Sequence, residues 1–370
     1  MKSASPSALF LSLLAFLIFT PRTSNSSAQT ITSFDPPNST GTFAFGINLN
    51  GQIAGTYIDG SVLSPVTAQT GFIRERDGTF TTFQPEVTFG ERTFRLPPRV
   101  NDINLEGDVV GTVPDGWTIT SSSFVRHKDG SVVVFKGPGT VGSAPDPAAI
   151  LRSPLPCDEC IDGSGAAAIN AIGQITGANG GSSYVGYLRQ PDGSMTFFSP
   201  STGSLATFPS SINVFGQITG YFKAPTPDHG FLRQRNGTFI SFDPPNSTTT
   251  RPRSINLFSQ ITGYFMDSNN VEHGFLRQPN GKFVTFDPPG STGTEPQSIN
   301  FWGEITGSYT TSFGVNHGFL REPNGNIITF DVPGASADGT FAKEINDLGI
   351  IVGYYMDTNL LVHGFVRTRK

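Results

Sequence analysis

The side chains with the most distinctive chemistry in this chain are its two cysteines, Cys157 and Cys160, in the stretch LPCDECIDG. In an exported protein a C-x-x-C pair typically forms a small disulfide, which gains little closure entropy because the ring is short. A redox pair needs a helix start after the motif, and zinc needs two further ligands. The following segment, IDGSGAAAIN, has no helical pattern. We predict a disulfide that stiffens a loop, with redox and zinc sites as the alternatives.

Histidine could supply a general base or a metal ligand, but four of the five histidines recur at one position of a repeat: His229, His273, His317 and His363. A residue that recurs in several copies cannot easily be the one catalytic group, because an active site needs a unique constellation. We therefore expect these histidines to be structural. His127, outside the repeated position, is a weak catalytic candidate.

Two short segments, DSNN at 267–270 and DTN at 357–359, alternate oxygen donors as calcium loops do. They lack the glycine of such a loop, and Gln278 stands at the twelfth position of the first, where an acidic residue is needed. We expect turns here. The sequence predicts no metal site and no cofactor.

An internal repeat must position all of these residues. Its marker is an Ile-Asn pair with a glycine seven residues after the asparagine, and it occurs seven times. The asparagines are Asn48, Asn104, Asn170, Asn213, Asn256, Asn300 and Asn346. The glycines are Gly55, Gly111, Gly177, Gly220, Gly263, Gly307 and Gly353.

Each copy predicts four short strands, shown in the fifth copy by residues 253–256, 260–266, 273–278 and 282–289. An Asn-Gly or Asp-Gly pair between the last two strands predicts a tight hairpin with a type I′ turn. The chain ends on a third strand and begins, after its leader, with a fourth.

These features predict an all-β fold, a seven-bladed β-propeller of four-stranded antiparallel blades. Its ring would be closed by the N-terminal strand joining the C-terminal blade, with the seventh blade shared between 31–37 and 343–370. An open β-solenoid is the alternative, but it would end in capping repeats.

The repeated phrases HGFLR, SIN..GQITGYF and NG.F..FDPPGST resemble those of the bacterial extracellular HAF-repeat proteins, over essentially all of residues 30–370. The resemblance implies export and a β-repeat architecture, and it brings no established activity. Copies one to three depart from the pattern, because they lack the signature histidine.

Two further residue types recur once per unit, and we expect both to be structural. The asparagines should lock turns, with a polar ring facing the central channel as the alternative. The arginines of the third strand should bond backbone carbonyls or the Asp of the FDPP motif, with an anion-binding ring as the alternative. They are Arg74, Arg126, Arg189, Arg233, Arg277, Arg321 and Arg367.

Long, irregular loops of the first three units lie between strands two and three or between units, so we expect them on one face. They hold the candidate binding residues. Trp117 could stack on a sugar or anchor a partner, although packing within the loop is an equal alternative. Asp158 and Glu159 could form an acidic rim, and Arg92, Arg95 and Arg152 could serve the same surface.

The N-terminal segment has a basic residue, an apolar run at 8–19 and small residues ending at Ala28, as secretory signal peptides do. We expect a signal peptide at 1–28, a single domain at 29–370, and a secreted or periplasmic protein without a membrane anchor. The chain has 24 basic and 29 acidic residues, a formal net charge of −5, which argues against nucleic acid as a partner.

Two functional hypotheses follow. The first is a non-catalytic, monomeric scaffold that binds an extracellular glycan or protein through the long-loop face of blades one to three. The second is a secreted lyase or hydrolase acting on polysaccharide or on a small cyclic substrate, with acids and histidines gathered from several loops. Non-repeated Asp, Glu or His side chains brought together by the fold would favour the second.

Overall fold

The computed structural model describes residues 29–62, 68–89, 92–114, 121–136, 165–180, 184–225 and 227–369. Every regular element in these ranges is a β-strand, which confirms the predicted all-β class. None of the described segments is a helix able to cross a bilayer.

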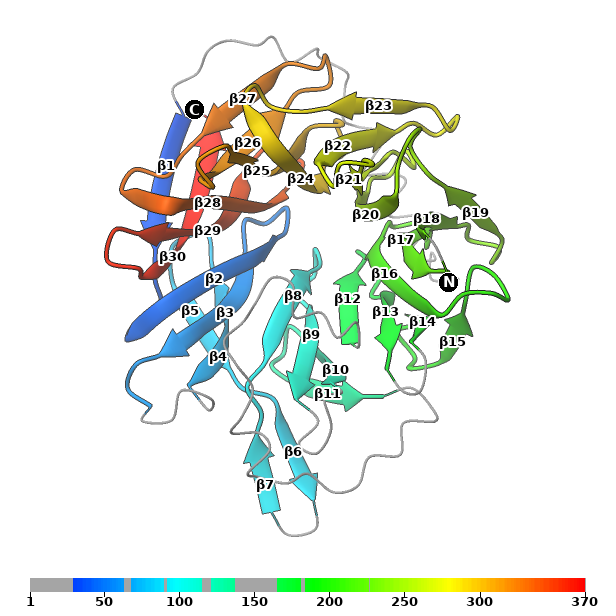
Figure 1. Cartoon of the computed structure of the whole chain (residues 1–370). Coiled ribbons are helices and arrows are strands. Elements are labelled where there is room, and N and C mark those ends of the chain that lie inside the picture. The colour runs from blue at the N-terminus through cyan, green and yellow to red at the C-terminus, as the bar shows by residue number, and fades with distance from the viewer. Residues whose placement is uncertain are drawn as a thin grey trace, which may run out of the picture.

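Most strands pair antiparallel in groups of four, which we number as units in the order of the repeat. One parallel pair, Gly41 with Val362, joins the first and last units into an eight-stranded sheet, and another, Asp228 with Thr249, joins the fourth and fifth. The first strands surround a common centre (Figure 1): β2 (Ser39–Ile47), β8 (Arg99–Ile103), β12 (Gly165–Ile169), β16 (Ala206–Ile212), β20 (Thr249–Ile255), β24 (Ser291–Ile299) and β28 (Ala335–Ile345). The second strands are β3 (Ile53–Asp59), β9 (Val109–Pro114), β13 (Ile175–Asn179), β17 (Ile218–Lys223), β21 (Ile261–Met266), β25 (Ile305–Thr311) and β29 (Ile351–Asp357).

The third strands are β4 (Gln69–Arg74), β10 (Ser121–Arg126), β14 (Val185–Arg189), β18 (Asp228–Arg233), β22 (Glu272–Arg277), β26 (Asn316–Arg321) and β30 (Val362–Arg369). The fourth strands are β5 (Phe80–Phe83), β11 (Val132–Phe135), β15 (Met195–Phe198), β19 (Phe239–Phe242), β23 (Phe283–Phe286), β27 (Ile327–Phe330) and β1 (Gln29–Phe34). A separate hairpin, β6 (Glu86–Phe89) and β7 (Arg92–Arg95), projects outward below β8–β11 (Figure 1).

The two ends of the described chain meet in one sheet. β1 pairs antiparallel with β30, in a register that runs from Gln29 opposite Arg369 to Phe34 opposite Gly364. The N-terminal strand therefore supplies the fourth strand of the last unit. The first strand of that unit, β28, already begins at Ala335, eight residues before the boundary predicted from the repeat.

The repeated asparagines form a continuous circuit of hydrogen bonds. Each Asn Nδ2 donates to the backbone carbonyl of the asparagine in the next unit, at 2.9 to 3.4 Å, and Asn346 donates to the Asn48 carbonyl. Each Asn Oδ1 also accepts from the backbone N–H four residues later, at 2.8 to 3.1 Å. One buried side chain thus holds its own turn and binds the neighbouring unit, so turn locking and ring formation occur together.

The repeated glycines are required by close packing between the first and second strands. A Cβ built on Gly263 would lie 2.1 Å from the Arg251 carbonyl oxygen, and one on Gly111 would lie 1.9 Å from that of Arg99. Neither glycine has a positive φ. Their role is to let the strand pass beside a β-bulge of its partner, where a side chain has no room.

The hairpins between third and fourth strands differ from the predicted type I′ turns. In the fifth unit Gly281 has a φ of 86°, but Asn280 is not among the residues with positive φ. The Gly281 N–H donates to the Gln278 carbonyl, and the Gln278 N–H donates to Lys282. This is the pattern of a longer loop, in which a type I turn is followed by a single left-handed glycine.

The repeated arginines bridge adjacent units by stacking on phenylalanine. The Arg277 guanidinium lies 4.8 Å from the centroid of Phe242, the phenylalanine of the preceding FDPP motif, and Arg74 lies 5.0 Å from Phe34. Arg277 also donates to the Gln278 carbonyl at 3.5 Å. Each repeated arginine stacks on the last phenylalanine of the preceding fourth strand, and five of the seven also donate to a backbone carbonyl. No described ion pair joins them to the Asp of FDPP.

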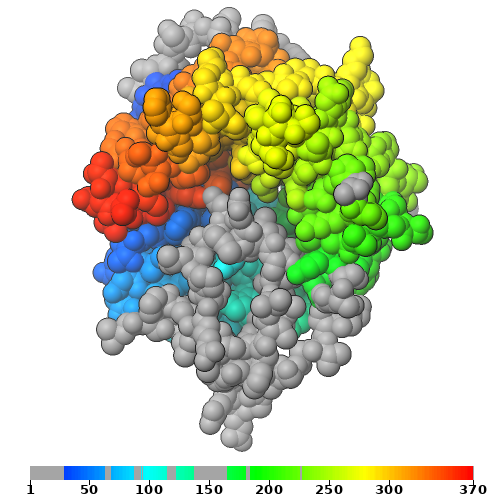
Figure 2. Space-filling view, viewed as in Figure 1, coloured from blue at the N-terminus to red at the C-terminus, as the bar shows by residue number. Residues whose placement is uncertain are grey.

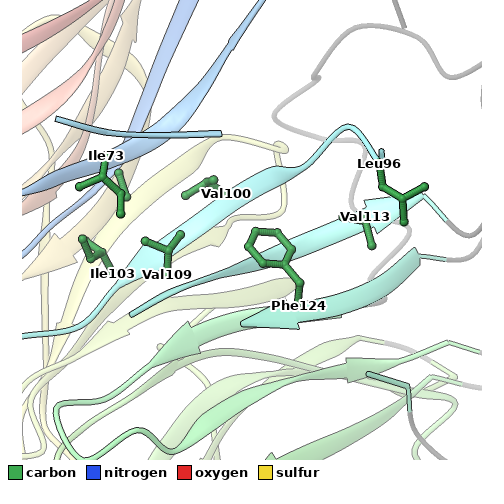
Figure 3. Packing of buried hydrophobic residues seen from close by; sticks show 8 residues of the cluster. Ile73, Leu96, Val100, Ile103, Val109, Val113 and Phe124 are labelled. Carbon is green, nitrogen blue, oxygen red and sulfur yellow. The ribbon is translucent and has the colours of Figure 1, made fainter. Parts of the chain in front are cut away.

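Apolar side chains fill the interfaces between neighbouring units. Between the first two, Ile73 packs against Val100, Ile103, Val109 and Phe124, and all five are at most 4% exposed (Figure 3). Similar clusters recur around the ring. The core is therefore divided into layers between sheets.

We predict that Asn256→Ala lowers the free energy of unfolding by about 2 to 4 kcal/mol, because several buried backbone and side-chain groups lose their partner. Urea unfolding measures the change. Asn269→Ala, at an exposed turn, is the control and should change it by about 0.5 kcal/mol or less. Equal stability of the two variants would mean that the asparagine circuit does not support the fold.

Candidate functional site

Most of the binding residues suggested by the long loops cannot be placed. Trp117, Arg152, Asp158 and Glu159 lie outside the described residues, as does the Cys157 and Cys160 pair. The predicted loop site and disulfide therefore stay predictions.

Arg92 and Arg95 lie on β7, in the hairpin that projects away from the ring (Figure 1). The Arg95 Nε lies 3.0 Å from a carboxylate oxygen of Glu86, and its side chain is 73% exposed. A surface ion pair of this kind contributes little binding energy. The structure does not bring these two residues to the centre of the ring.

The repeated histidines are paired with the aspartates of the FDPP motifs. The Nδ1–carboxylate distances are 2.6 Å for His229–Asp243, 2.7 Å for His273–Asp287, 2.9 Å for His317–Asp331 and 2.7 Å for His363–Asp35. Each histidine ring also lies against an aromatic ring of its second strand. The sequence analysis missed this pairing.

A pocket of about 750 Å³ lies beside His273 and is also lined by Phe265, Asp267 and Lys282. The Asp267 carboxylate accepts the backbone N–H groups of Asn269 and Val271, so it holds a turn in this pocket. Because the histidine–aspartate pair recurs in four units, this pocket has no unique catalytic group.

The fold brings together two acids that do not belong to the repeat. Asp102 of β8 and Glu344 of β28 both stand two positions before a repeated asparagine, on first strands that flank β2. Between them, β2 has Gly46, where an added Cβ would lie 3.3 Å from Glu344 Oε2 and 3.2 Å from the Ile103 nitrogen. The absence of a side chain at Gly46 leaves room for the Glu344 carboxyl group beside Ile103, the neighbour of Asp102 in β8.

Backbone N–H groups of neighbouring strands hold both carboxyl groups in place. Glu344 Oε2 accepts from Ile47 at 2.7 Å, and Asp102 Oδ2 accepts from Ile169 at 2.9 Å. Asp102 Oδ1 accepts from Ile103 at 2.7 Å. Each residue as a whole is partly exposed, but the carboxyl groups themselves are buried.

The surroundings favour the protonated forms of this pair. Burial raises the pKa of Asp102 to about 7, although its two backbone hydrogen bonds act in the opposite direction. Burial, and then the charge of Asp102, raises the pKa of Glu344 well above its ordinary value. Burial therefore favours the protonated form of both carboxyl groups toward neutral pH.

Aligning the repeats would have revealed the two acids. At this position the seven units read Gly46, Asp102, Ala168, Ser211, Ser254, Ser298 and Glu344. Small residues are the rule, and two acids are the exceptions. The sequence analysis searched the long loops and did not compare the first strands position by position.

Aromatic and cationic side chains lie on other first and second strands around the same centre. Tyr354 stacks on Phe341 with centroids 5.1 Å apart and meets Phe43 edge-on, also at 5.1 Å. In the fourth unit Tyr221 stacks on Phe208 at 4.8 Å, and the Arg251 guanidinium lies 3.7 Å from its ring centroid. In space-filling form, the face is hollowed at its centre between the orange, yellow and green segments (Figure 2).

No protein-family model matches the chain, and no characterised protein matches it by sequence. Several solved structures are similar to it in fold. Virginiamycin B lyase from Staphylococcus aureus is similar, with a TM-score of 0.57 and 14% identity over 93% of this chain and 100% of that one. A streptogramin B lyase has a TM-score of 0.55 and 13% identity over 91% and 97% of the two chains. Puromycin hydrolase has a TM-score of 0.52 and 12% identity over 90% of this chain and 54% of its own.

The similarity shows that the fold is that of a β-propeller. It also corrects the leading functional prediction, because the similar structures are catalytic propellers and not binding scaffolds. A catalytically inactive histidine-to-alanine variant of the Staphylococcus lyase has been solved with quinupristin. The non-catalytic scaffold is therefore set aside. At this level of identity the similarity brings no particular reaction to this chain.

The raised pKa values predict a pH dependence of stability. In the folded state Asp102 and Glu344 bind protons more tightly than in the unfolded chain, so the free energy of unfolding should fall as pH rises from about 4 to about 7. Each pKa unit corresponds to about 1.4 kcal/mol. Urea unfolding from about pH 4 to about pH 8 measures the slope.

Glu344→Gln keeps an oxygen that accepts the Ile47 N–H and removes one of the two ionisable groups. The free energy of unfolding of this variant should therefore change less with pH than that of the wild type. Glu106→Gln, at an exposed turn, is the matched control and should keep the wild-type slope. The same slope in Glu344→Gln and wild type would contradict a raised pKa of Glu344.

Proposed function

We propose that the protein is an exported lyase or hydrolase acting on polysaccharide or on a small cyclic substrate, and that Asp102 and Glu344 are its acid and base. One observation carries this proposal. Among the described residues, these two non-repeated carboxyl groups occupy the same repeat position on the strands that flank β2, the charge of Asp102 acts on Glu344, and both groups have raised pKa values.

The proposed chemistry uses the state in which one carboxyl group of the pair is protonated and the other is ionised. The protonated carboxyl donates to the leaving oxygen or nitrogen of the substrate. The ionised one accepts a proton, from water in a hydrolase or from carbon in a lyase. The hydrogen bond from Ile47 fixes one oxygen of Glu344 and leaves Oε1 without a described partner, so this oxygen is available to a substrate.

The finer architecture is part of the proposal. We infer seven blades in a closed ring, with β1 completing the last one. Support comes from the asparagine circuit, which passes through seven residues and returns to Asn48, and from the pairing of β1 with β30. We also propose kinship with the HAF-repeat proteins and export with cleavage near Ala28, which the N-terminal residue of the secreted protein would reveal.

Closure predicts slow amide exchange at the β30 edge. Deleting residues 29–34 removes the strand that covers β30, so backbone amides of β30 that pair with β1 should exchange much faster. Hydrogen exchange followed by mass spectrometry compares the two chains. Unchanged protection of β30 after the deletion would contradict closure by β1.

The catalytic proposal is tested by incubating the purified protein with a panel of polysaccharides and with quinupristin. Mass spectrometry then gives the molecular masses of the products. Addition of water identifies a hydrolase, and cleavage without it identifies a lyase. Glu344→Gln and Asp102→Asn should each lower kcat by about 10²- to 10⁴-fold.

Glu106→Gln should keep full activity, and thermal melting should show that all variants are folded. Product formation at the wild-type rate by both carboxyl variants would place the catalytic groups elsewhere. A complete lack of product from every substrate would contradict the proposal that the protein is a lyase or hydrolase of these substrates.

A further inference from the structure

We propose that the fifth and seventh units each bind a divalent transition-metal ion, such as Zn²⁺, between a repeated histidine and the aspartate that follows the second strand. These aspartates begin the motifs DSNN at 267–270 and DTN at 357–359. Neither site involves a residue of the proposed catalytic pair.

In the fifth unit, His273 stands between two carboxylates. Its Nδ1 lies 2.7 Å from Asp287 Oδ2, and its Nε2 lies 3.8 Å from Asp267 Oδ2. The first distance is that of a hydrogen bond, whereas the second is too long for one. The histidine is therefore held from one side and faces an open gap on the other.

The seventh unit has the same arrangement. His363 Nδ1 lies 2.7 Å from Asp35 Oδ2, and its Nε2 lies 3.6 Å from Asp357 Oδ2. Units four and six also pair the histidine with the aspartate of FDPP, but Ala224 and Thr311 stand where the second aspartate would be. The facing aspartate is thus an addition to the scaffold pair, made in two units with the same geometry.

The hydrogen bond at Nδ1 determines what Nε2 can bind. An ionised carboxylate only accepts, so Nδ1 of His273 carries the hydrogen, and in the neutral ring Nε2 has a free lone pair. This lone pair faces Asp267, where the backbone hydrogen bond from Val271 lowers the pKa of the carboxyl group. Two acceptors that face each other are favourable only with a cation between them. A carboxylate behind the ring is also the usual partner of a metal-ligating histidine.

The spacing and the exposure of the side chains suit a metal ion. A nitrogen and an oxygen bound to one tetrahedral Zn²⁺ lie about 3.4 Å apart, because each is about 2 Å from the metal. Small rotations of the side chains bring the observed 3.6 and 3.8 Å to this value. The two histidines and their facing aspartates are 20 to 26% exposed, so an ion can reach them from solvent. The pocket beside His273 has room for water ligands.

The donor set favours a borderline metal ion over calcium. The described residues contain no cluster of three or more metal-binding side chains, so each site has two protein ligands and water completes the coordination. Imidazole nitrogen suits Zn²⁺, Ni²⁺ and Cu²⁺. Asp267 Oδ2 also accepts from Asn269 Nδ2 at 3.2 Å, but a carboxylate oxygen has a second lone pair for the ion.

Calorimetric titration of the untagged protein with Zn²⁺ at about pH 7.5 tests the proposal. A Cys157→Ser, Cys160→Ser background removes the other candidate zinc ligands. We expect two ions per chain. Asp267→Asn and Asp357→Asn should each weaken one site by roughly tenfold or more and leave the other unchanged, because the amide keeps the turn and loses the charge.

His229→Gln is the matched control, since His229 occupies the same repeat position without a facing aspartate, and this variant should still bind two ions. Circular dichroism should show that all variants are folded. Zn²⁺ should raise the melting temperature of the parent but not that of the Asp267→Asn, Asp357→Asn double variant.

No binding of Zn²⁺ at about 1 mM would overturn the inference and leave a proton on the histidine as the bridge between the two groups. Two ions still bound by the double variant, or loss of both ions in His229→Gln, would also overturn it.

Discussion

The bifunctional hydrogen bonding of one asparagine per unit is the constraint on which the rest of this structure depends. The carbonyl oxygen of the side chain fixes the turn between the first two strands, and the amide nitrogen reaches the turn of the next unit. Because both bonds come from one planar group, the shape of the turn and the position of the neighbouring unit are not independent. Repetition of the contact sets all first strands at one level, which is why side chains at equal distance from their asparagine meet around the centre.

Much of this architecture follows from the sequence, because it is repeated. Each copy carries the same turn and strand signals, so one unit predicts the others, and the fourth strand missing from the C-terminal end is found at Gln29–Phe34. The geometry of the hairpin turns between third and fourth strands was harder to predict from the sequence. The Asn280-Gly281 pair is compatible with more than one loop length, and the choice depends on where Gln278 and Lys282 pair.

The candidate site was not predictable in the same way. Asp102 and Glu344 lie in different units, on first strands that flank β2, and the missing side chain of Gly46 leaves room for the Glu344 carboxyl group. A repeat analysis emphasises what the copies share, whereas this site consists of what they do not share. The histidine–aspartate pairs show the opposite case: they look catalytic in one unit, and their recurrence in four units shows that they are part of the scaffold.

The pairing of β1 with β30 has a consequence for the order of folding. The partner of β1 follows every other described strand in the sequence, so Gln29–Phe34 has no edge to join until β30 has been made. Contacts between distant parts of a chain form slowly because of the entropy of closing a long loop. Intermediate units can form from local hairpins as they emerge, but the last sheet is incomplete until the two ends meet. Completion of this sheet is therefore coupled to synthesis of β30.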